Sequence, residues 1–312
     1  MGKSSALRRD VFFRSAKEEG YRARSAYKLL HLDEQFGLFA NVDRCVDLCA
    51  APGSWSQVLT NKLNENRASS PEDNATIVAV DLQPMAPLPG VIQIEGDITK
   101  SSTAEAIIGH FKGDRADLVV CDGAPDVTGL HDLDEFVQAQ LLLAALNITL
   151  HVLRPGGTFV AKIFRGRDVT LLYDQLRSFF ERVTCAKPRS SRNSSMEAFV
   201  VCERFRSGFT PDLTKPLLDF SYASGDSKTS NYPSQQSSGG QTNALTGEMR
   251  VIAPFVACGD LSGFDSETFY PDRALSDSLV AAGPVQPPTA PPYREYIEKR
   301  RAGNFDHMHL KA

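Results

Sequence analysis

The chain has 312 residues, of which 42% are hydrophobic, and this is enough to bury a sizeable core in one large domain with extensions. Its formal net charge of −4 argues against nucleic-acid binding by the chain as a whole, so any such partner must be recognised by local positive charge. No apolar run reaches membrane-spanning length and no signal sequence is recognisable, so we expect no membrane partner and a cytoplasmic location.

The first 28 residues carry eight lysines and arginines against three acidic residues, with four aromatic residues interleaved. Such a segment suits phosphate contacts combined with stacking on bases or sugars. A solvated helical face with core aromatics is the competing interpretation. From Ser25 to Phe36, apolar residues recur at helical spacing, which predicts an amphipathic helix that carries Lys28. We assign residues 1–22 to a basic N-terminal arm.

Residues 45–59 have the pattern of a strand, a tight turn and a helix. A short apolar run contains Asp47, small residues and a Pro-Gly pair follow at 50–53, and apolar residues then recur at helical spacing over 54–63. Glycine allows backbone to approach a ligand closely beyond the carboxyl end of a strand. The turn lacks the three spaced glycines of a dinucleotide site and the Gly-Lys-Ser/Thr of a phosphate loop. A ligand with an adenosine but no phosphate therefore fits best.

Acidic residues end this strand and three further predicted strands, at 77–81, 91–97 and 117–122; the four acids are Asp47, Asp81, Asp97 and Asp122. An acid at the tip of the second strand is placed to accept hydrogen bonds from a ribose diol, and one after the third strand to meet an adenine amino group. Each acid alone is more often a helix cap or a turn residue. Their recurrence at one edge of a sheet favours a ligand site.

A long helix is predicted at 133–153, followed by a strand at 158–164 that contains Lys162. A lysine in a strand buried on both faces is destabilising unless it is paired or lies at a cleft. A helix at 168–181 and strands at 182–186 and 197–203 follow. Between these strands, the basic loop 187–195 suits phosphate contacts, although a solvated turn would have the same composition.

The composition changes after residue 205. Residues 221–247 are rich in Ser, Gly, Gln and Asn and are expected to be flexible, and the proline-rich segment 284–292 is expected to be an extended linker. An apolar element at 251–257 and a short charged helix at 294–301 lie around this linker. We therefore divide the chain into the arm, a catalytic domain at 23–205 and a partly flexible extension at 206–312.

Two lysines and two acids point to a particular chemistry: Lys28, Asp122, Lys162 and Glu197. Methylation of a ribose hydroxyl requires a site that holds the methyl donor in line with the oxygen and accepts a proton from a very weak acid. A lysine can accept that proton only if burial or another cation lowers its pKa. Two carboxylates offset the repulsion between the two lysines of such a cluster, and no metal is required.

The motifs around these residues resemble those of the FtsJ/RrmJ-type 2′-O-ribose methyltransferases, and most closely the eukaryotic branch that acts on the tRNA anticodon loop. The matching segments are 22–28 (RARSAYK), 47–57 (DLCAAPGSWSQ), 122–126 (DGAPD), 160–164 (VAKIF) and 187–195 (KPRSSRNSS). The tail segments 251–262 and 287–293 resemble the C-terminal extension of the tRNA branch, which compact bacterial ribosomal-RNA enzymes lack.

The resemblance implies an α/β, class I S-adenosylmethionine-dependent methyltransferase with a Rossmann-like, mostly parallel seven-stranded sheet. It implies a catalytic tetrad of Lys28, Asp122, Lys162 and Glu197, with Lys162 as proton acceptor, and donor contacts at Gly53, Trp55, Asp81, Asp97 and Asp122. It also implies tRNA as substrate, including the wobble nucleotide, and adaptor proteins of helical-repeat and WD-repeat types. Candidate RNA contacts are Arg22, Arg24, Arg165, Lys187, Arg189 and Arg192.

Other functions stay open on the sequence alone. The same chemistry on ribosomal RNA or an mRNA cap would need the same tetrad, since the tetrad reads a ribose and not a sequence. A non-catalytic RNA-binding scaffold is less favoured, because every tetrad position is filled. A nicotinamide dehydrogenase is disfavoured by the missing glycine fingerprint. The six cysteines lack the spacing of a zinc site and are expected to be buried free thiols.

Overall fold

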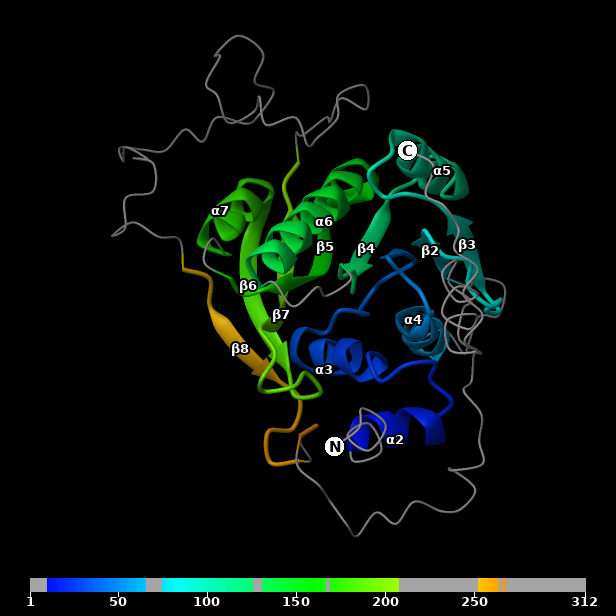
Figure 1. Ribbon diagram of the computed structural model, residues 1–312. Coiled ribbons are helices and arrows are strands. Elements are labelled where there is room, and N and C mark those ends of the chain that lie inside the picture. The colour runs from blue at the N-terminus through cyan, green and yellow to red at the C-terminus, as the bar shows by residue number, and fades with distance from the viewer. Residues whose placement is uncertain are drawn as a thin grey trace, which may run out of the picture.

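The computed structural model describes residues 10–65, 75–125, 131–166, 169–207, 252–263 and 266–267. These residues build an eight-stranded sheet in the order β3-β2-β1-β4-β5-β7-β6-β8 (Figure 1). Only β7 runs antiparallel to its neighbours, and every other pairing is parallel. The strands are β1 (Arg44–Leu48), β2 (Thr76–Asp81), β3 (Val91–Glu95), β4 (Ala116–Cys121), β5 (Leu153–Phe164), β6 (Phe180–Pro188), β7 (Glu197–Phe205) and β8 (Phe255–Cys258).

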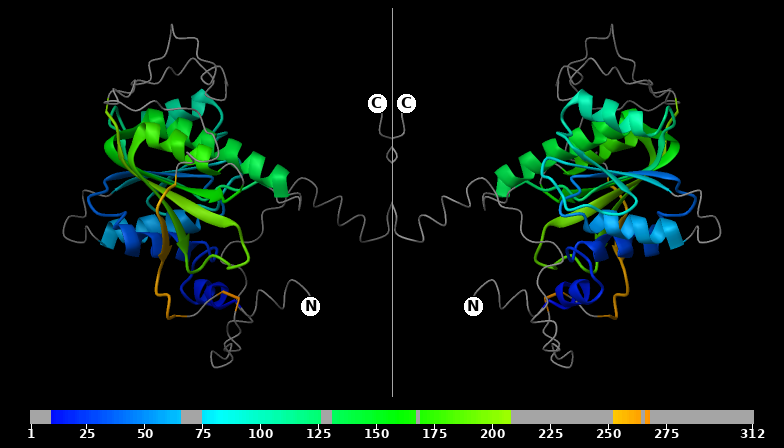
Figure 2. Two further views of the ribbon diagram at one scale, coloured as in Figure 1. Left: turned by 90° about the vertical axis from the view of Figure 1, so that its left-hand side faces the viewer. Right: turned by 90° about the vertical axis from the view of Figure 1, so that its right-hand side faces the viewer.

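Helices cover both faces of this sheet, as the two side views in Figure 2 show. One face is covered by α3 and α4, and the other by α5, α6 and α7. A further helix, α2, packs against α3. The helices are α2 (Val11–Glu18), α3 (Ala26–Phe36), α4 (Ser54–Glu65), α5 (Ser101–His110), α6 (His131–Val152) and α7 (Val169–Phe179).

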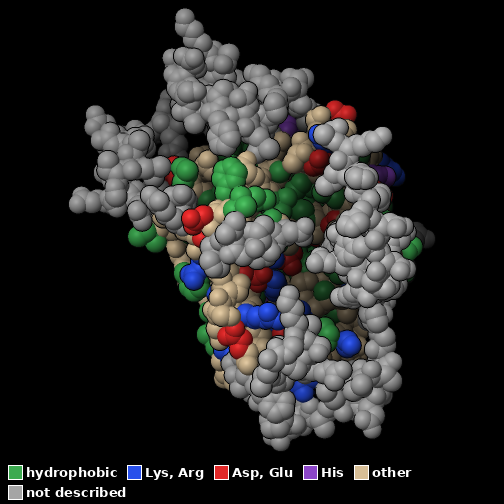
Figure 3. Space-filling view, in the orientation of Figure 1, with side chains coloured by type: hydrophobic (Ala, Val, Ile, Leu, Met, Phe, Trp, Pro, Cys, Tyr) green, Lys and Arg blue, Asp and Glu red, His purple; other side chains and the backbone are tan. Residues whose placement is uncertain are grey.

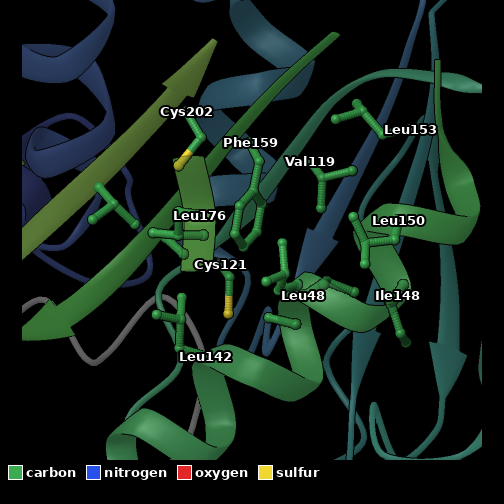
Figure 4. Close-up of a cluster of buried hydrophobic side chains, with 14 of the residues drawn as sticks. Leu48, Val119, Cys121, Leu142, Ile148, Leu150, Leu153, Phe159, Leu176 and Cys202 are labelled. Atoms are coloured by element: carbon green, nitrogen blue, oxygen red, sulfur yellow. The ribbon is translucent and has the colours of Figure 1, made fainter. Parts of the chain in front are cut away.

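The central strands are apolar on both faces because they lie between the two helical layers. In β1, Val46 and Leu48 belong to the hydrophobic cluster under α5, α6 and α7, whereas Cys45 belongs to the cluster under α3 and α4. This alternation follows from the two-residue period of a strand in a sheet covered on both sides. Figure 4 shows part of the first cluster, where Phe159 of β5 packs among Val119 and Leu176. The packing fixes where each strand ends, and therefore where the site lies.

The longest helix, α6, is the one helix of the described residues that is long and apolar enough to cross a membrane, by length and composition alone. Within the molecule, 56% of the apolar stretch in Asp132–Val152 is buried. Leu142, Ala145 and Leu150 belong to the same cluster as β4 and β5, against which the helix packs. These contacts identify α6 as a core helix of the α/β fold.

The structure confirms the expected fold class and the expected order of strands and helices. The sheet has eight strands where the resemblance implies seven, because β8 extends it beside β6. The prediction also lacked α2 and α5. In β5, the strand begins at Leu153 and not at residue 158, with an irregular register against β4 between Ala116 and Leu118. All six cysteines are free thiols; five are buried as expected, and Cys49 is only partly buried.

The predicted extension takes part in the sheet. β8 covers part of the apolar element expected at 251–257, and its backbone pairs with β6 from Cys185 to Pro188. The division at residue 205 stays a prediction, but this segment is not separate from the catalytic domain. The segments expected at 221–247, 284–292 and 294–301, and residues 1–9 of the N-terminal arm, lie outside the described residues.

Candidate active site

The carboxyl ends of β1, β2, β4 and β5 meet at one edge of the sheet because these strands run parallel. Residues 49–53, which we call the donor turn, leave this edge between β1 and α4. The N–H of Ala51 donates to Asp81 Oδ2 at 2.8 Å, and the N–H of Gln83 donates to Asp81 Oδ1 at 2.8 Å. Asp81 therefore holds the donor turn beside the segment that follows β2.

The other predicted donor residues differ in what their side chains contact. Trp55 is almost fully buried, and its indole N–H donates to the Ser25 carbonyl at 2.8 Å. Asp97 accepts hydrogen bonds from the N–H and hydroxyl of Thr99, which lower its pKa. Asp97 thus forms its own turn, the alternative that the sequence left open for each acid.

Buried Asp47 precedes the donor turn and anchors α4. Its carboxylate accepts a hydrogen bond from Ser56 at 2.6 Å, and burial raises its pKa to about 7. The acid in the strand thereby fixes the first turn of the following helix. Asp47 was predicted as one of the recurring edge acids, and its role in the structure is to join β1 to α4.

The four tetrad residues meet at the same edge. Lys28 comes from α3, Asp122 follows β4, and Lys162 and Glu197 lie on the paired strands β5 and β7. Because Lys162 pairs with Phe199 and Phe164 pairs with Glu197, the lysine and the glutamate project from the same face of the sheet. Figure 3 shows acidic and basic side chains gathered in the middle of the visible face, near α3 and β7.

Each lysine of the tetrad contacts both acids. Lys28 Nζ lies 2.7 Å from Glu197 Oε2 and 3.7 Å from Asp122 Oδ1. Lys162 Nζ lies 3.2 Å from Glu197 Oε2 and 3.3 Å from Asp122 Oδ1. The four side chains are 11–16% exposed, so the cluster is shielded but open at one end. The sequence pattern predicted all four residues, and the structure brings them together.

Electrostatics within the tetrad favour the charged forms of Glu197 and Lys162. Burial raises the pKa of Glu197, but Lys28 and Lys162 outweigh it and bring the pKa down to about 2. Burial lowers the pKa of Lys162, but Asp122 and Glu197 reverse the sign and raise it overall. In the free protein Lys162 is therefore protonated, whereas the sequence argument required a lowered pKa for a base.

Two buried polar residues that support the tetrad were not predicted. The Ser191 hydroxyl donates to Glu197 Oε1 at 2.7 Å and is 2% exposed. The Gln138 amide on α6 donates to the Lys162 carbonyl at 2.9 Å and is 3% exposed. Gln138 could have been found from the sequence, because a polar residue on the buried face of an apolar helix indicates a buried hydrogen bond. Ser191 has no comparable signal, because it lies among several serines of the basic loop 187–195.

Arg22 and Arg24, two predicted RNA contacts, have partners within the protein. The Arg22 guanidinium donates to the carbonyls of Pro52 and Ala86, each at 2.9 Å, and of Pro87 at 3.0 Å. Arg24 forms an ion pair with Asp10 and donates to the carbonyl of Ser190. Burial and the neighbouring Arg192 lower the pKa of Arg24 to about 10.

The other predicted RNA contacts lie around the basic loop 187–195 and β8. Lys187 Nζ donates to the Ser195 carbonyl at 2.6 Å, and the Arg189 guanidinium donates to the Gly263 carbonyl at 2.7 Å. Arg165 lies over the ring of Phe255 at 4.9 Å. Arg165 and Arg192 are exposed, whereas the other four predicted residues are partly buried.

Comparison with known proteins agrees with an α/β methyltransferase architecture. The model of the FtsJ-like methyltransferase family matches residues 21–205, and the chain belongs to this family. A human protein named tRNA (cytidine(32)/guanosine(34)-2′-O)-methyltransferase is 59% identical, and the match covers 98% of this chain and 87% of the length of the human protein. A Schizosaccharomyces pombe protein of the same name is 54% identical over 97% of this chain and 99% of its own.

A solved structure extends the likeness to the backbone. A Plasmodium falciparum crystal structure, provisionally named a ribosomal RNA methyltransferase, has a TM-score of 0.53 and 25% identity, covering 59% of this chain and 98% of that one. The family takes its methyl group from S-adenosylmethionine, and this chain is an enzyme of that kind.

The residues at the carboxyl edge fit this donor. A hollow of about 30 Å³ at the donor turn, with room for only a few atoms, is lined by small residues, two acids and one tryptophan: Ser25, Asp47, Cys49, Ala50, Ala51, Ser54, Trp55 and Asp122. A Cβ at Gly123 would lie 2.9 Å from Cys49 Sγ, so the backbone approaches this edge closely. Carboxylates suit the hydroxyl and cationic groups of the donor. Asp81 and Asp122 would hold its ribose and its charged end.

A larger hollow, of about 460 Å³, lies between α6, β5 and α7. Its lining is mostly apolar and includes Phe136, Leu142 and Leu172. No tetrad residue and no predicted donor residue lines it. The larger hollow therefore offers none of the residues that the sequence predicts to contact the donor.

Proposed function

We propose that this chain transfers a methyl group from S-adenosylmethionine to the 2′-hydroxyl of tRNA anticodon-loop nucleotides, including the wobble position. The observation that carries the proposal is the tetrad, in which both lysines contact both acids beside the donor turn. The human and S. pombe relatives, whose names specify cytidine 32 and guanosine 34 of tRNA, match nearly the whole chain and support tRNA as substrate.

Lys162 is proposed as the proton acceptor. S-adenosylmethionine, when bound, supplies the methyl group and a positive sulfonium charge. A positive charge close to the tetrad would oppose the effect of Asp122 and Glu197, which raise the pKa of Lys162, and would favour the neutral amine. Lys28 holds Glu197 at 2.7 Å and thereby keeps part of that carboxylate's charge away from Lys162. Neutral Lys162 then accepts the proton of the ribose hydroxyl.

This role predicts a direction for the pH dependence of turnover. The free tetrad favours protonated Lys162, whose pKa is raised above its usual value, and only the neutral amine can accept a proton. Turnover should therefore rise with pH from neutral into the alkaline range, at saturating donor and RNA. A rate that falls over this range contradicts the assignment of Lys162 as base.

RNA and adaptor proteins are proposed as partners. Arg165 and Arg192 are the exposed members of the predicted RNA-contact set and lie near the basic loop and β8, so they can reach phosphates. Adaptor proteins of helical-repeat and WD-repeat types are implied by the resemblance. Exposed Leu133, Phe136 and Val137 on α6 are apolar side chains of the kind that partner proteins cover.

The decisive experiment is mass-spectrometric mapping of 2′-O-methyl groups in tRNA and ribosomal RNA from cells that lack the protein. Wild type should restore anticodon-loop methylation, and Lys162→Ala should not. Lys62→Ala, which removes a lysine that pairs with Glu65 on the surface, is the matched control and should restore it.

Other results of this mapping would redirect the proposal. Intact anticodon-loop methylation with a loss in ribosomal RNA or at an mRNA cap would keep the chemistry and overturn tRNA as substrate. Restoration by Lys162→Ala would overturn the base assignment. No change in any RNA would favour a non-catalytic RNA-binding role.

A further inference from the structure

Arg22 joins two segments that the sequence keeps apart. Its Nη1 donates to the carbonyl of Pro52 in the donor turn and to the carbonyl of Ala86, both at 2.9 Å. Its Nη2 donates to the Pro87 carbonyl at 3.0 Å. Its backbone N–H donates to the side chain of Gln57 on α4 at 2.8 Å. One side chain therefore holds the turn after β1 against the segment after β2.

Arg22 and Leu88 pack closely around Gly53 in the donor turn. A Cβ on Gly53 would lie 2.8 Å from Arg22 Nη1 and 3.0 Å from Leu88 Cδ1, and the residue has a φ of 102°. Glycine is required by this backbone conformation, and the guanidinium of Arg22 lies where a side chain at this position would begin.

Asp81 joins the same two segments through hydrogen bonds of the opposite kind. Its carboxylate accepts the N–H of Ala51 in the donor turn and the N–H of Gln83 after β2. Arg22 donates to carbonyls of these segments and Asp81 accepts from their amides, so both residues hold the donor turn against the segment after β2. Partial burial lowers the pKa of Arg22, which nevertheless stays charged because arginine is a very weak acid.

We propose that Arg22 is a positioning residue of the methyl-donor site and not an RNA contact. It preforms the donor turn, so that the donor binds a site that is already in place. The inference rests on the proposed donor site at this edge and not on tRNA as substrate. The two ideas can therefore fail separately.

The test compares Arg22→Lys with wild type in three measurements on the full chain. Lysine keeps the charge but cannot reach three carbonyls with one planar fork. Isothermal titration calorimetry should give an affinity for S-adenosylhomocysteine about tenfold weaker. Hydrogen exchange in the ligand-free protein should be faster at the amides of Ala51 and Gly53, and affinity for an unmodified tRNA transcript at fixed salt should be unchanged.

Two further variants complete the design. Arg177→Lys changes an arginine on α7 that donates to the Ile252 carbonyl at 2.8 Å, and it should leave all three measurements unchanged. Arg22→Gln replaces Arg22→Lys if a lysine without its carbonyl partners prevents folding, because glutamine leaves no unpaired charge.

Two outcomes overturn the proposal. Unchanged affinity for S-adenosylhomocysteine, whether or not tRNA affinity falls, means that Arg22 does not shape the donor site. Weaker affinity with unchanged hydrogen exchange at Ala51 and Gly53 means that Arg22 contacts the donor directly and does not act through the turn.

Discussion

The tetrad and the basic loop 187–195 both carry cations, but two cations of the loop, Lys187 and Arg189, donate to carbonyls, while Arg192 lies 4.0 Å from the Asp10 carboxylate. Lys28 and Lys162 are held by two carboxylates, so their positions are fixed by charge in a shielded space. Lys187 and Arg189 are held by the carbonyls of Ser195 and Gly263. A carboxylate neutralises its partner and sets its pKa, whereas a carbonyl fixes the geometry and leaves the positive charge available. The first arrangement suits proton chemistry and the second suits the attraction of a polyanion.

The largest expected effect tests the tetrad side of this comparison. Lys162→Ala in the purified protein should lower kcat by about 10²-fold to 10⁴-fold, the usual contribution of a general base. Affinity for S-adenosylhomocysteine should change little, because Lys162 is assigned to the hydroxyl and not to the donor. Single-turnover kinetics and calorimetry measure the two quantities. A variant that retains most of its turnover contradicts the assignment, and Lys62→Ala controls for the loss of a lysine.

The next effect concerns stability in acid. Glu197 has a folded-state pKa of about 2, below its ordinary value of 4.5. A carboxylate whose pKa is lower in the folded protein than in the unfolded chain stabilises the fold. This stabilisation is complete above the pKa of the group in the unfolded chain, and it is lost as the pH falls to the pKa of the group in the folded protein. The full contribution is about 3 kcal/mol. Denaturant unfolding at stepped pH should show this loss between about pH 5 and pH 2.

The matched variants decide whether Glu197 is the source. Glu197→Gln should flatten the dependence of the unfolding free energy on pH over this range. Glu203→Gln, which breaks a surface pair with Arg182, should leave the dependence as in wild type. Equal pH dependence in Glu197→Gln and wild type would show that the lysines do not stabilise this carboxylate.

A smaller effect is expected at the donor turn. Asp81→Ala removes the acceptor of the Ala51 and Gln83 amides and the proposed acceptor of the donor ribose. Affinity for S-adenosylhomocysteine should fall by about tenfold, the cost of unpaired buried groups. Asp33→Ala removes a carboxylate that accepts the Phe39 amide at the end of α3, and it should leave donor affinity unchanged. Equal affinities in Asp81→Ala and wild type would mean that Asp81 serves the fold alone.

The two regions also differ in how far the sequence predicts them. Asp81, Asp122 and Lys162 follow or lie in strands with strong apolar patterns, and parallel strands bring their carboxyl ends to one edge, so a local pattern predicts a shared site. Arg22 and Arg24 share the composition of an RNA-binding arm, yet their partners lie at Ala86 and Ser190. Such long-range hydrogen bonds depend on how α3 packs on the sheet, and no local pattern encodes that packing. β8 is short and pairs with a strand far away in sequence, so its place in the sheet was equally hidden.

Ser191 connects the two regions and gives the smallest predicted effect. Ser191 lies in the basic loop, where Arg189 donates to the carbonyls of Cys258 and Gly263. The Ser191 hydroxyl donates to Glu197 in the tetrad. Ser191→Ala should lower kcat about fivefold through loss of one hydrogen bond to a charged group, with donor affinity unchanged. Because that hydrogen bond lowers the pKa of Glu197, the acid transition of the variant should also move to higher pH. Ser178→Ala on α7, where the hydroxyl donates to the Asp174 carbonyl, is the control. If kcat falls and the acid transition does not move, Ser191 acts through the conformation of the loop and not through Glu197.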